Sequence, residues 1–174
     1  MSPTADVDPD AGRDPRIDIA QVVYSFADGI DRREWDAYRS IFVEPPDRIT
    51  FDYESYNGRP ASRLTSDEWL AAVRPLFDGL HATQHTMTNP IVEIEPGGRA
   101  ARCRVYMQAA HFLWGDEVNE PEFTIGGYYD DHLVVHDDAQ GKGWKIDAVK
   151  LTVWWRRGND EIMDIARRTT GSGR

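Results

Sequence analysis

The stretch ATQHTMTN, residues 82–89, has the side-chain alternation of a β-strand. His85, Met87 and Asn89 share one face, and the residues between them share the other. A histidine beside a methionine, with a carboxamide further along the same face, indicates an imidazole held inside a pocket. Taken alone, the pattern favours a core histidine with a structural hydrogen-bond partner. Whether His85 does chemistry therefore depends on what the rest of the chain places beside it.

Four long alternating segments predict that the second half of the chain is almost entirely strand. Turn sequences rich in glycine, proline and acidic residues separate them. On the second segment, one face is apolar with the single exception of His111. A shorter strand is expected at residues 48–53. The long strands are expected at residues 83–95, 101–114, 123–136 and 144–157.

Helical patterns fill most of the first half of the chain. Pro15 suits the first turn of a helix, and apolar residues then recur at steps of three and four as far as Asp31. The sequence TSDE, residues 65–68, matches a capping box that opens a later helix. The expected helices span residues 15–31, 35–44, 66–78 and 160–168.

This order of elements predicts an α+β domain. Long strands joined by hairpins are expected to form a strongly curved antiparallel sheet, with the helices across its concave side. The space between the two layers is a natural deep, apolar pocket for a small molecule. The domain is expected at residues 15–168, with disordered tails at 1–14 and 169–174.

Composition narrows the classes of partner. The chain has 174 residues and a net charge of −10, which argues against nucleic acids and anionic membranes because both are polyanions. Its single cysteine, Cys103, allows no internal disulfide. Residues 1–15 hold no apolar run, so this stretch is expected to be neither a signal peptide nor a membrane anchor. A reducing, cytoplasmic setting is therefore expected.

Four polar side chains lie on, or at the end of, otherwise apolar faces: Asp31, Tyr53, His85 and His111. A carboxylate beside an imidazole holds one tautomer and raises the basicity of the ring, as general-base catalysis requires. A second histidine and a tyrosine could protonate a leaving hydroxyl or polarise a carbonyl. The set would suffice to remove a proton beside a carbonyl and expel a β-substituent, with no cofactor.

Structural roles remain open for each of these groups. Asp31 also begins the sequence DRRE, which matches a capping box for the second helix, so Asp31 could cap, catalyse or do both. Tyr53 could be a core or rim residue, and His111 a buried histidine with a satisfied hydrogen bond.

A metal site is not expected. His81 and His85 are four residues apart, as are His132 and His136, but both pairs lie in or beside predicted strands. Four strand residues span ~13 Å, too far for two ligands of one ion.

Four stretches together resemble a known family: IDRREWD (30–36), ITFDY (49–53), TQH (83–85) and QAAH (108–111). Their order and spacing are similar to those of SnoaL-like domains of the nuclear-transport-factor-2-like superfamily, and most similar to those of the scytalone dehydratases. The resemblance implies a cone-shaped α+β barrel around a deep apolar cavity. It implies a dyad of Asp31 and His85, with His85 as the general base. His111 and Tyr53 would bind the oxygen functions of the substrate, directly or through a water.

The resemblance also suggests further substrate-binding residues. Asn89 matches an asparagine of related eliminating enzymes. Ile30 replaces a tyrosine of the dehydratases, and Tyr24, two turns earlier on the Asp31 side of the helix, could substitute for it. Tyr129 on the fourth strand and Trp154 complete the expected set. Trp154 could line the pocket mouth or an oligomer contact, although core packing is the favoured alternative. The serine and asparagine of the dehydratases fall at Asp130 and His132, which suggests a different substrate.

The resulting hypothesis is a cofactor-independent dehydratase that eliminates water from a hydrophobic cyclic or polyketide-like hydroxyketone. Isomerisation or cyclisation would use the same base, so the sequence does not separate the three reactions. A noncatalytic ligand carrier or assembly subunit of the same fold is the alternative from another class. An open sheet face is usually buried between subunits, so a homodimer or homotrimer is expected.

Overall fold

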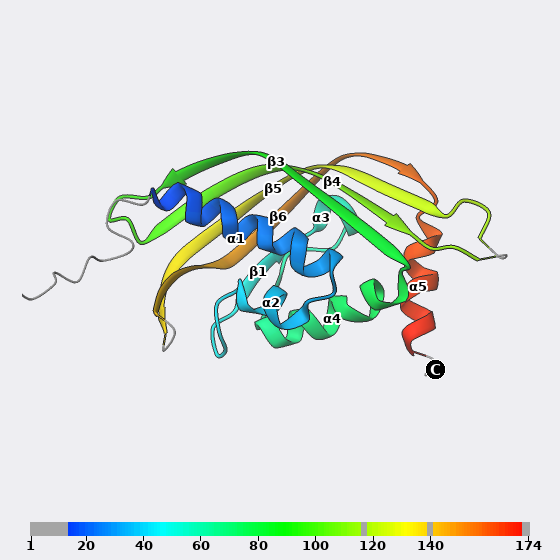
Figure 1. Ribbon diagram of the computed structural model, residues 1–174, viewed down its shortest axis with the longest axis horizontal. Coiled ribbons are helices and arrows are strands. Elements are labelled where there is room, and N and C mark those ends of the chain that lie inside the picture. Colours follow the sequence, from blue (N-terminus) through cyan, green and yellow to red (C-terminus); the bar gives the residue numbers. More distant parts are fainter. Residues whose placement is uncertain (1–13, 116–117, 139–140, 172–174) are drawn as a thin grey trace, which may run out of the picture.

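The computed structural model describes residues 14–115, 118–138 and 141–171. Figure 1 shows one strongly arched sheet with helices beneath it and a last helix at one end. The helices are α1 (Pro15–Asp31), α2 (Trp35–Ser40), α3 (Glu54–Asn57), α4 (Ser66–Gly79) and α5 (Glu161–Gly171). The strands are β1 (Ile49–Asp52), β2 (Ser62–Leu64), β3 (Ala82–Ile94), β4 (Ala100–Phe112), β5 (Glu122–Asp138) and β6 (Gly141–Gly158).

The six strands form one sheet in the order β2-β1-β6-β5-β4-β3. The four long strands pair antiparallel with their chain neighbours, as the hairpin turns predict. The short strand β1 runs parallel to β6, so the sheet is mixed rather than purely antiparallel. In the described part of the chain β2 and β3 are the two edges, so the curved sheet does not close into the expected barrel.

Helix α1 lies across the concave side of the sheet and packs against β3. It begins where expected, because the Asp14 side chain accepts a hydrogen bond from the Arg16 amide and Pro15 occupies the first turn. Helix α4 begins with the predicted capping box, in which Thr65 and Glu68 each bond the other's amide. It ends at Gly79, where an added Cβ would lie 2.1 Å from the Ala166 carbonyl oxygen of α5. The glycine therefore permits the close α4–α5 contact.

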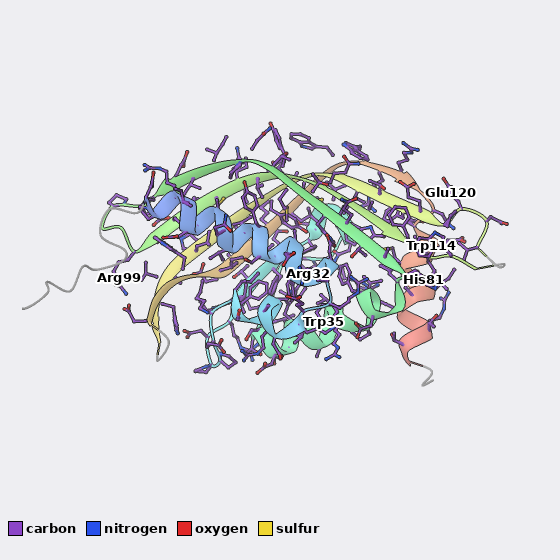
Figure 2. The ribbon with its side chains drawn as sticks, viewed as in Figure 1. Arg32, Trp35, His81, Arg99, Trp114 and Glu120 are labelled. Atoms are coloured by element: carbon purple, nitrogen blue, oxygen red, sulfur yellow. The ribbon has the colours of Figure 1, made fainter. Side chains whose placement is uncertain are left out.

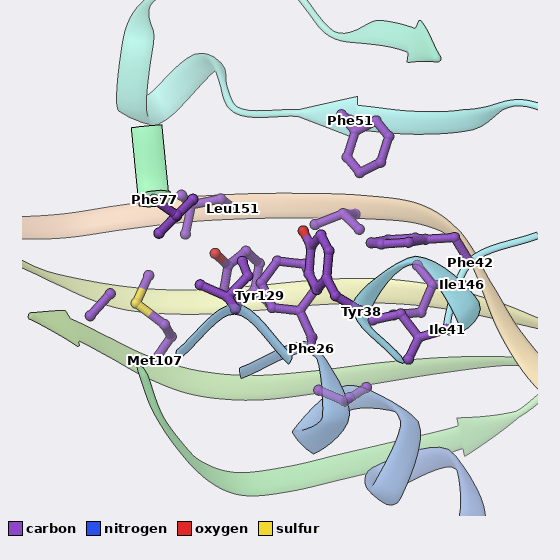
Figure 3. Packing of buried hydrophobic residues seen from close by; sticks show 14 of the residues in the cluster. Phe26, Tyr38, Ile41, Phe42, Phe51, Phe77, Met107, Tyr129, Ile146 and Leu151 are labelled. Atoms are coloured by element: carbon purple, nitrogen blue, oxygen red, sulfur yellow. The ribbon is translucent and has the colours of Figure 1, made fainter. Parts of the chain in front are cut away.

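The core fills the space between the helices and the sheet, and its centre is aromatic. The Phe26 ring of α1 lies 5.2 Å from Tyr38 and 5.3 Å from Tyr129, measured between ring centroids (Figure 3). On β4 every second residue from Ala101 to His111 is buried, which confirms the predicted apolar face. Alternation at the sequence level therefore identified the inner face of the sheet correctly.

Two local expectations differ from the structure. The alternation of β3 does not reach Asn89, because the register with β4 shifts between Thr88 and Ile91 and Asn89 adopts a left-handed φ of 55°. Helix α5 continues to Gly171 instead of ending at residue 168, so residues 169–171 are not a tail. The rest of the two expected tails, residues 1–13 and 172–174, lies outside the described residues. None of the helices in the described ranges has the length and apolar content of a membrane span.

Candidate active site

The end of α1 delivers Asp31 to strand β3. Helix α1 finishes at Asp31, and the chain turns at once through Arg33, whose φ of 60° is left-handed. The Asp31 carboxylate accepts three hydrogen bonds from β3: 2.8 Å from the Thr83 hydroxyl, 2.6 Å from the His85 amide and 2.7 Å from His85 Nδ1. Helix α2 starts after Glu34 without any side-chain cap. Asp31 therefore faces His85 and does not cap the second helix.

The partners of Asp31 decide which nitrogen of His85 carries a proton. Burial works against ionisation of the Asp31 carboxyl, but the hydrogen bonds and charge of His85 prevail and hold the pKa of Asp31 below its ordinary value. An ionised carboxylate can only accept, so His85 Nδ1 is the donor. In the neutral ring Nε2 then carries the lone pair. The His85 side chain is 4% exposed and lines a cavity, so this lone pair belongs to a sheltered base.

His111 is the second imidazole of the site. Burial, with the charge of His85 as the second cause, lowers the pKa of His111 to about 4, so the ring is neutral at physiological pH. Its Nδ1 lies 3.0 Å from the Phe123 carbonyl oxygen, which can only accept. Nδ1 is therefore protonated and Nε2 is an acceptor. The rings of His85 and His111 lie 5.8 Å apart, centroid to centroid, at 85°.

Both histidines line a cavity of ≈ 650 Å³ between the helices and the sheet. Its wall is mainly aromatic and aliphatic, which agrees with the predicted apolar pocket. Tyr53 and Tyr129 belong to this wall, with ring centroids 6.4 Å apart. Burial raises the pKa of both phenols, so both hydroxyls stay protonated, and a side-chain hydrogen bond joins them. The cavity also includes Phe26, Ile30, Phe51, Trp69, Leu76, Phe77, Ile125 and Leu151.

The structure thus brings His85, His111, Tyr53 and Tyr129 together around this cavity, with Asp31 behind His85. Three other predicted substrate-binding residues do not line it. Tyr24 packs half-buried against the core. Asn89 is exposed beyond the irregularity of β3. Trp154 is 61% exposed and contacts Tyr106 and Tyr128 on the outer face of the sheet.

On strand β5, the residues that point inward are not Asp130 and His132, the two positions that the resemblance indicated. Asp130 bonds Arg104, and His132 bonds Asp147, so both residues take part in polar pairs away from the cavity. Tyr129 and Asp131 are the residues that point inward, one position earlier in the alternation. Burial raises the pKa of Asp131 well above its ordinary value, and its Oδ1 has no hydrogen-bond partner among the described residues.

Two supporting residues were not identified as such from the sequence. The Arg33 guanidinium donates to the Ile30 and Asp31 carbonyls and to the Thr83 hydroxyl at 3.0 Å. Thr83 in turn donates to Asp31 at 2.8 Å, so one hydroxyl links Arg33 to the dyad. Thr83 lies two residues before His85 on an alternating strand, and this shared face was a usable signal. Arg33 depends on a left-handed turn that no local pattern predicts.

His81 lies at the end of the sheet near α5, beside Trp114 (Figure 2). Its Nδ1 accepts a hydrogen bond of 3.0 Å from the Trp114 amide. Arg32 and Trp35 mark the turn between α1 and α2 in the same figure, and the Trp35 indole donates to Asp78.

No three His, Cys, Asp or Glu side chains are grouped to hold a metal in the part of the chain that the structure describes.

A strongly curved sheet that encloses a pocket with a helical layer is the architecture of the nuclear-transport-factor-2-like class of α+β proteins. Within this class, residues 14–150 match the model of the SnoaL-like domain. The chain belongs to the SnoaL-like family. A sequence search of curated proteins finds no match to the chain.

Solved structures share the fold over most of the chain. Protein Kfla4162 from Kribbella flavida is 28% identical, with 86% of this chain and 96% of that chain covered and a TM-score of 0.73. A candidate scytalone dehydratase from Novosphingobium aromaticivorans is 17% identical, with 82% and 86% covered and a TM-score of 0.65. The hexachlorocyclohexane dehydrochlorinase LinA-type3 from Novosphingobium barchaimii is 17% identical, with 84% and 90% covered and a TM-score of 0.65.

Proposed function

We propose that the protein is a cofactor-independent lyase, a dehydratase of a hydrophobic cyclic or polyketide-like hydroxyketone. The observation that carries the proposal is the 2.7 Å bond between Asp31 and His85 Nδ1 beside the cavity. It orients the ring so that Nε2 is the free base. The names of two structural relatives, a candidate scytalone dehydratase and a dehydrochlorinase, accord with elimination chemistry on this fold.

The proposed reaction has two steps and regenerates the enzyme. His85 Nε2 takes the proton from the carbon beside the carbonyl, and the electron pair of that C–H bond moves into an enolate. The hydrogen-bonded hydroxyl pair of Tyr53 and Tyr129 donates a hydrogen bond to an oxygen atom of the substrate, which stabilises the developing charge. The C–O bond at the β-carbon then breaks, and the departing hydroxide takes the proton from His85 to leave as water. Asp31 stays ionised and stabilises the imidazolium between the steps.

His111 has a narrower role in this proposal than the sequence suggested. Because its Nδ1–H donates to Phe123, its Nε2 can accept a hydrogen bond but has no proton to give. His111 Nε2 therefore accepts a hydrogen bond from the β-hydroxyl of the substrate and orients it. The proton that completes the water comes from His85, which favours removal of hydrogen and hydroxyl from the same face.

The test is proton exchange into substrate and product in deuterated water over a panel of cyclic hydroxyketones. His85→Ala should lower both exchange and water loss by roughly 10²–10⁴ while the fold is kept. Asp31→Asn should lower them as well, because the amide cannot stabilise the imidazolium. Full activity of both variants would contradict the proposed base. Exchange without water loss would point instead to isomerisation or cyclisation, and binding without exchange to a noncatalytic carrier.

We also propose a homodimer or homotrimer and a cytoplasmic location. Exposed aromatic residues on the outer sheet face support the former. The acidic composition and the single cysteine support the latter.

A further inference from the structure

The charged residues that line the cavity are positive, whereas the net charge of the chain is negative. The chain has 30 acidic residues and 20 arginines and lysines. The cavity wall nevertheless includes Arg59 and Arg167 and, among the described residues, no aspartate or glutamate. We propose that the site takes an organic anion, with an apolar ring body in the cavity and a carboxylate, sulfonate or phosphate group between these arginines. This inference rests on the proposed function, since it names the substrate class of the same site.

The two arginines come from separate elements that both reach the cavity. Arg59 follows Gly58, whose left-handed φ of 69° ends helix α3 and turns the chain toward β2. Arg167 lies on α5, one turn after Met163, which also lines the cavity. Both arginines are exposed, so they belong to the open end of the cavity and not to its floor. A charged group held there keeps part of its hydration, which lowers the cost of binding it.

Both guanidinium groups have hydrogen-bonding capacity left for a ligand. The acidic neighbour of Arg167 is Asp164, at 3.9 Å, which is beyond hydrogen-bond distance. Arg59 uses its backbone amide to bond the Asn57 side chain, which orders the turn, and its guanidinium has no hydrogen-bond or ion-pair partner within the described ranges. A third arginine, Arg156, lies 5.0 Å from the centroid of the Tyr56 ring, which also lines the cavity. Asp160 and Asp164 also act electrostatically on Tyr56, so three arginines outnumber two carboxylates at this end of the cavity, on a strongly negative molecule.

The inner end of the cavity would repel an anionic group. The Nε2 atoms of His85 and His111 present lone pairs there, and Asp31 lies directly behind His85. An anionic ligand is therefore directed with its charge toward Arg59 and Arg167 and its apolar carbons toward the histidines. Without these arginines, the net charge of −10 would disfavour the approach of any anion.

Two dyes with nearly the same ring system test the inference without knowledge of the substrate. Anilinonaphthalene sulfonate is an anion, and N-phenylnaphthylamine is its neutral counterpart. Titration of both into the full-length protein, read by dye fluorescence, should give tighter binding of the anion. The double variant Arg59→Gln/Arg167→Gln should weaken anion binding by about 3- to 10-fold, as expected for two partly exposed ion pairs, and leave neutral-dye binding within about twofold. About 0.5 M salt should have a similar effect on the wild type.

Two control variants make each outcome decisive. Arg63→Gln removes an exposed positive charge from β2 that does not line the cavity, and it should leave anion binding unchanged. Ala72→Trp places a large ring at an exposed cavity-lining position of α4 and should weaken both dyes. Equal binding of the two dyes, or equal effects of the Arg63 and Arg59/Arg167 variants, would overturn the anion inference and leave the proposed dehydratase standing. If Ala72→Trp affects neither dye, the cavity is not a binding site, and both proposals fail.

Discussion

The Asp31 carboxylate accepts hydrogen bonds from three groups of strand β3: the Thr83 hydroxyl, the His85 amide and the His85 ring. The Thr83 hydroxyl can be removed without changing His85, so it is the best group to test. It accepts from Arg33 at 3.0 Å and donates to Asp31 at 2.8 Å. Thr83→Val keeps the side-chain shape but removes both bonds. The carboxylate then loses a donor, so we expect a turnover about 10-fold lower, in line with the loss of one charge-assisted hydrogen bond.

The conservative variant separates a positioning role of Thr83 from a merely structural one. Thr83→Ser retains the hydroxyl and should restore most of the turnover. The pH profile of kcat should change in Thr83→Val but not in Thr83→Ser. An unchanged profile in both variants would show that Thr83 does not act on the dyad.

His111 should make the stability of the fold depend on pH. Burial lowers the pKa of its imidazole from 6.5 to about 4 in the folded protein. Between these values the unfolded chain binds a proton that the folded chain does not, so stability falls as the pH drops through this window. The full effect is at most about 3 kcal/mol.

This dependence is measurable by urea unfolding at about pH 7 and about pH 5. His111→Asn has no titrating group and should flatten the change between the two conditions. If the variant and the wild type lose the same stability, His111 is not the cause. Asp31 has a lowered pKa, so its own contribution is present at both conditions and is lost only in more acidic solution.

At the scale of the elements, the contact between α1 and α2 sets the position of Asp31. Gly29 of α1 lies against Tyr38, and an added Cβ would be 2.8 Å from Tyr38 Cβ and 3.0 Å from its Cα. Alanine in place of glycine favours a helix by up to about 1 kcal/mol. The backbone of Tyr38 cannot rotate away, however, and overpacking typically costs about 1–3 kcal/mol. We therefore expect Gly29→Ala to destabilise the protein and to lower turnover by moving Asp31.

Thermal unfolding and turnover of Gly29→Ala test this expectation together. Ser25→Ala, on an exposed position of the same helix, is the matched control and should change neither quantity strongly. A more stable Gly29→Ala protein would show that α1 and α2 can separate without cost.

At the scale of the whole molecule, the outer face of the sheet carries a cluster of aromatic residues around the exposed Trp154. Trp154 is flanked by Tyr106 and Tyr128, with ring centroids 5.7 Å and 5.1 Å away. Such a patch is typical of a surface that another subunit covers. We expect a dimer or trimer by light scattering, and Trp154→Ser should shift the mass toward the monomer. A wild type that is monomeric at every concentration would contradict the proposed assembly.

Local patterns in the sequence determined much of this protein. Alternation predicted the four long strands and the inner face of β4, because side chains of a strand point to opposite faces with a period of two. The capping box predicted the start of α4, because its two hydrogen bonds join residues three apart. The same patterns singled out Asp31, Tyr53, His85 and His111, since each is a polar exception on, or at the end of, an apolar face.

Only the tertiary structure decided what these groups can do. Asp31 and His85 are 54 residues apart, so no local pattern distinguishes a helix cap from a partner of the imidazole. The same holds for Arg59 and Arg167, which are far apart in the chain and line one cavity only in the folded protein. The irregularity of β3 and the outward direction of Trp154 likewise follow from pairing between strands. Hydrogen bonds and charges act between atoms that are close in space, and it is the folded chain that brings these atoms together.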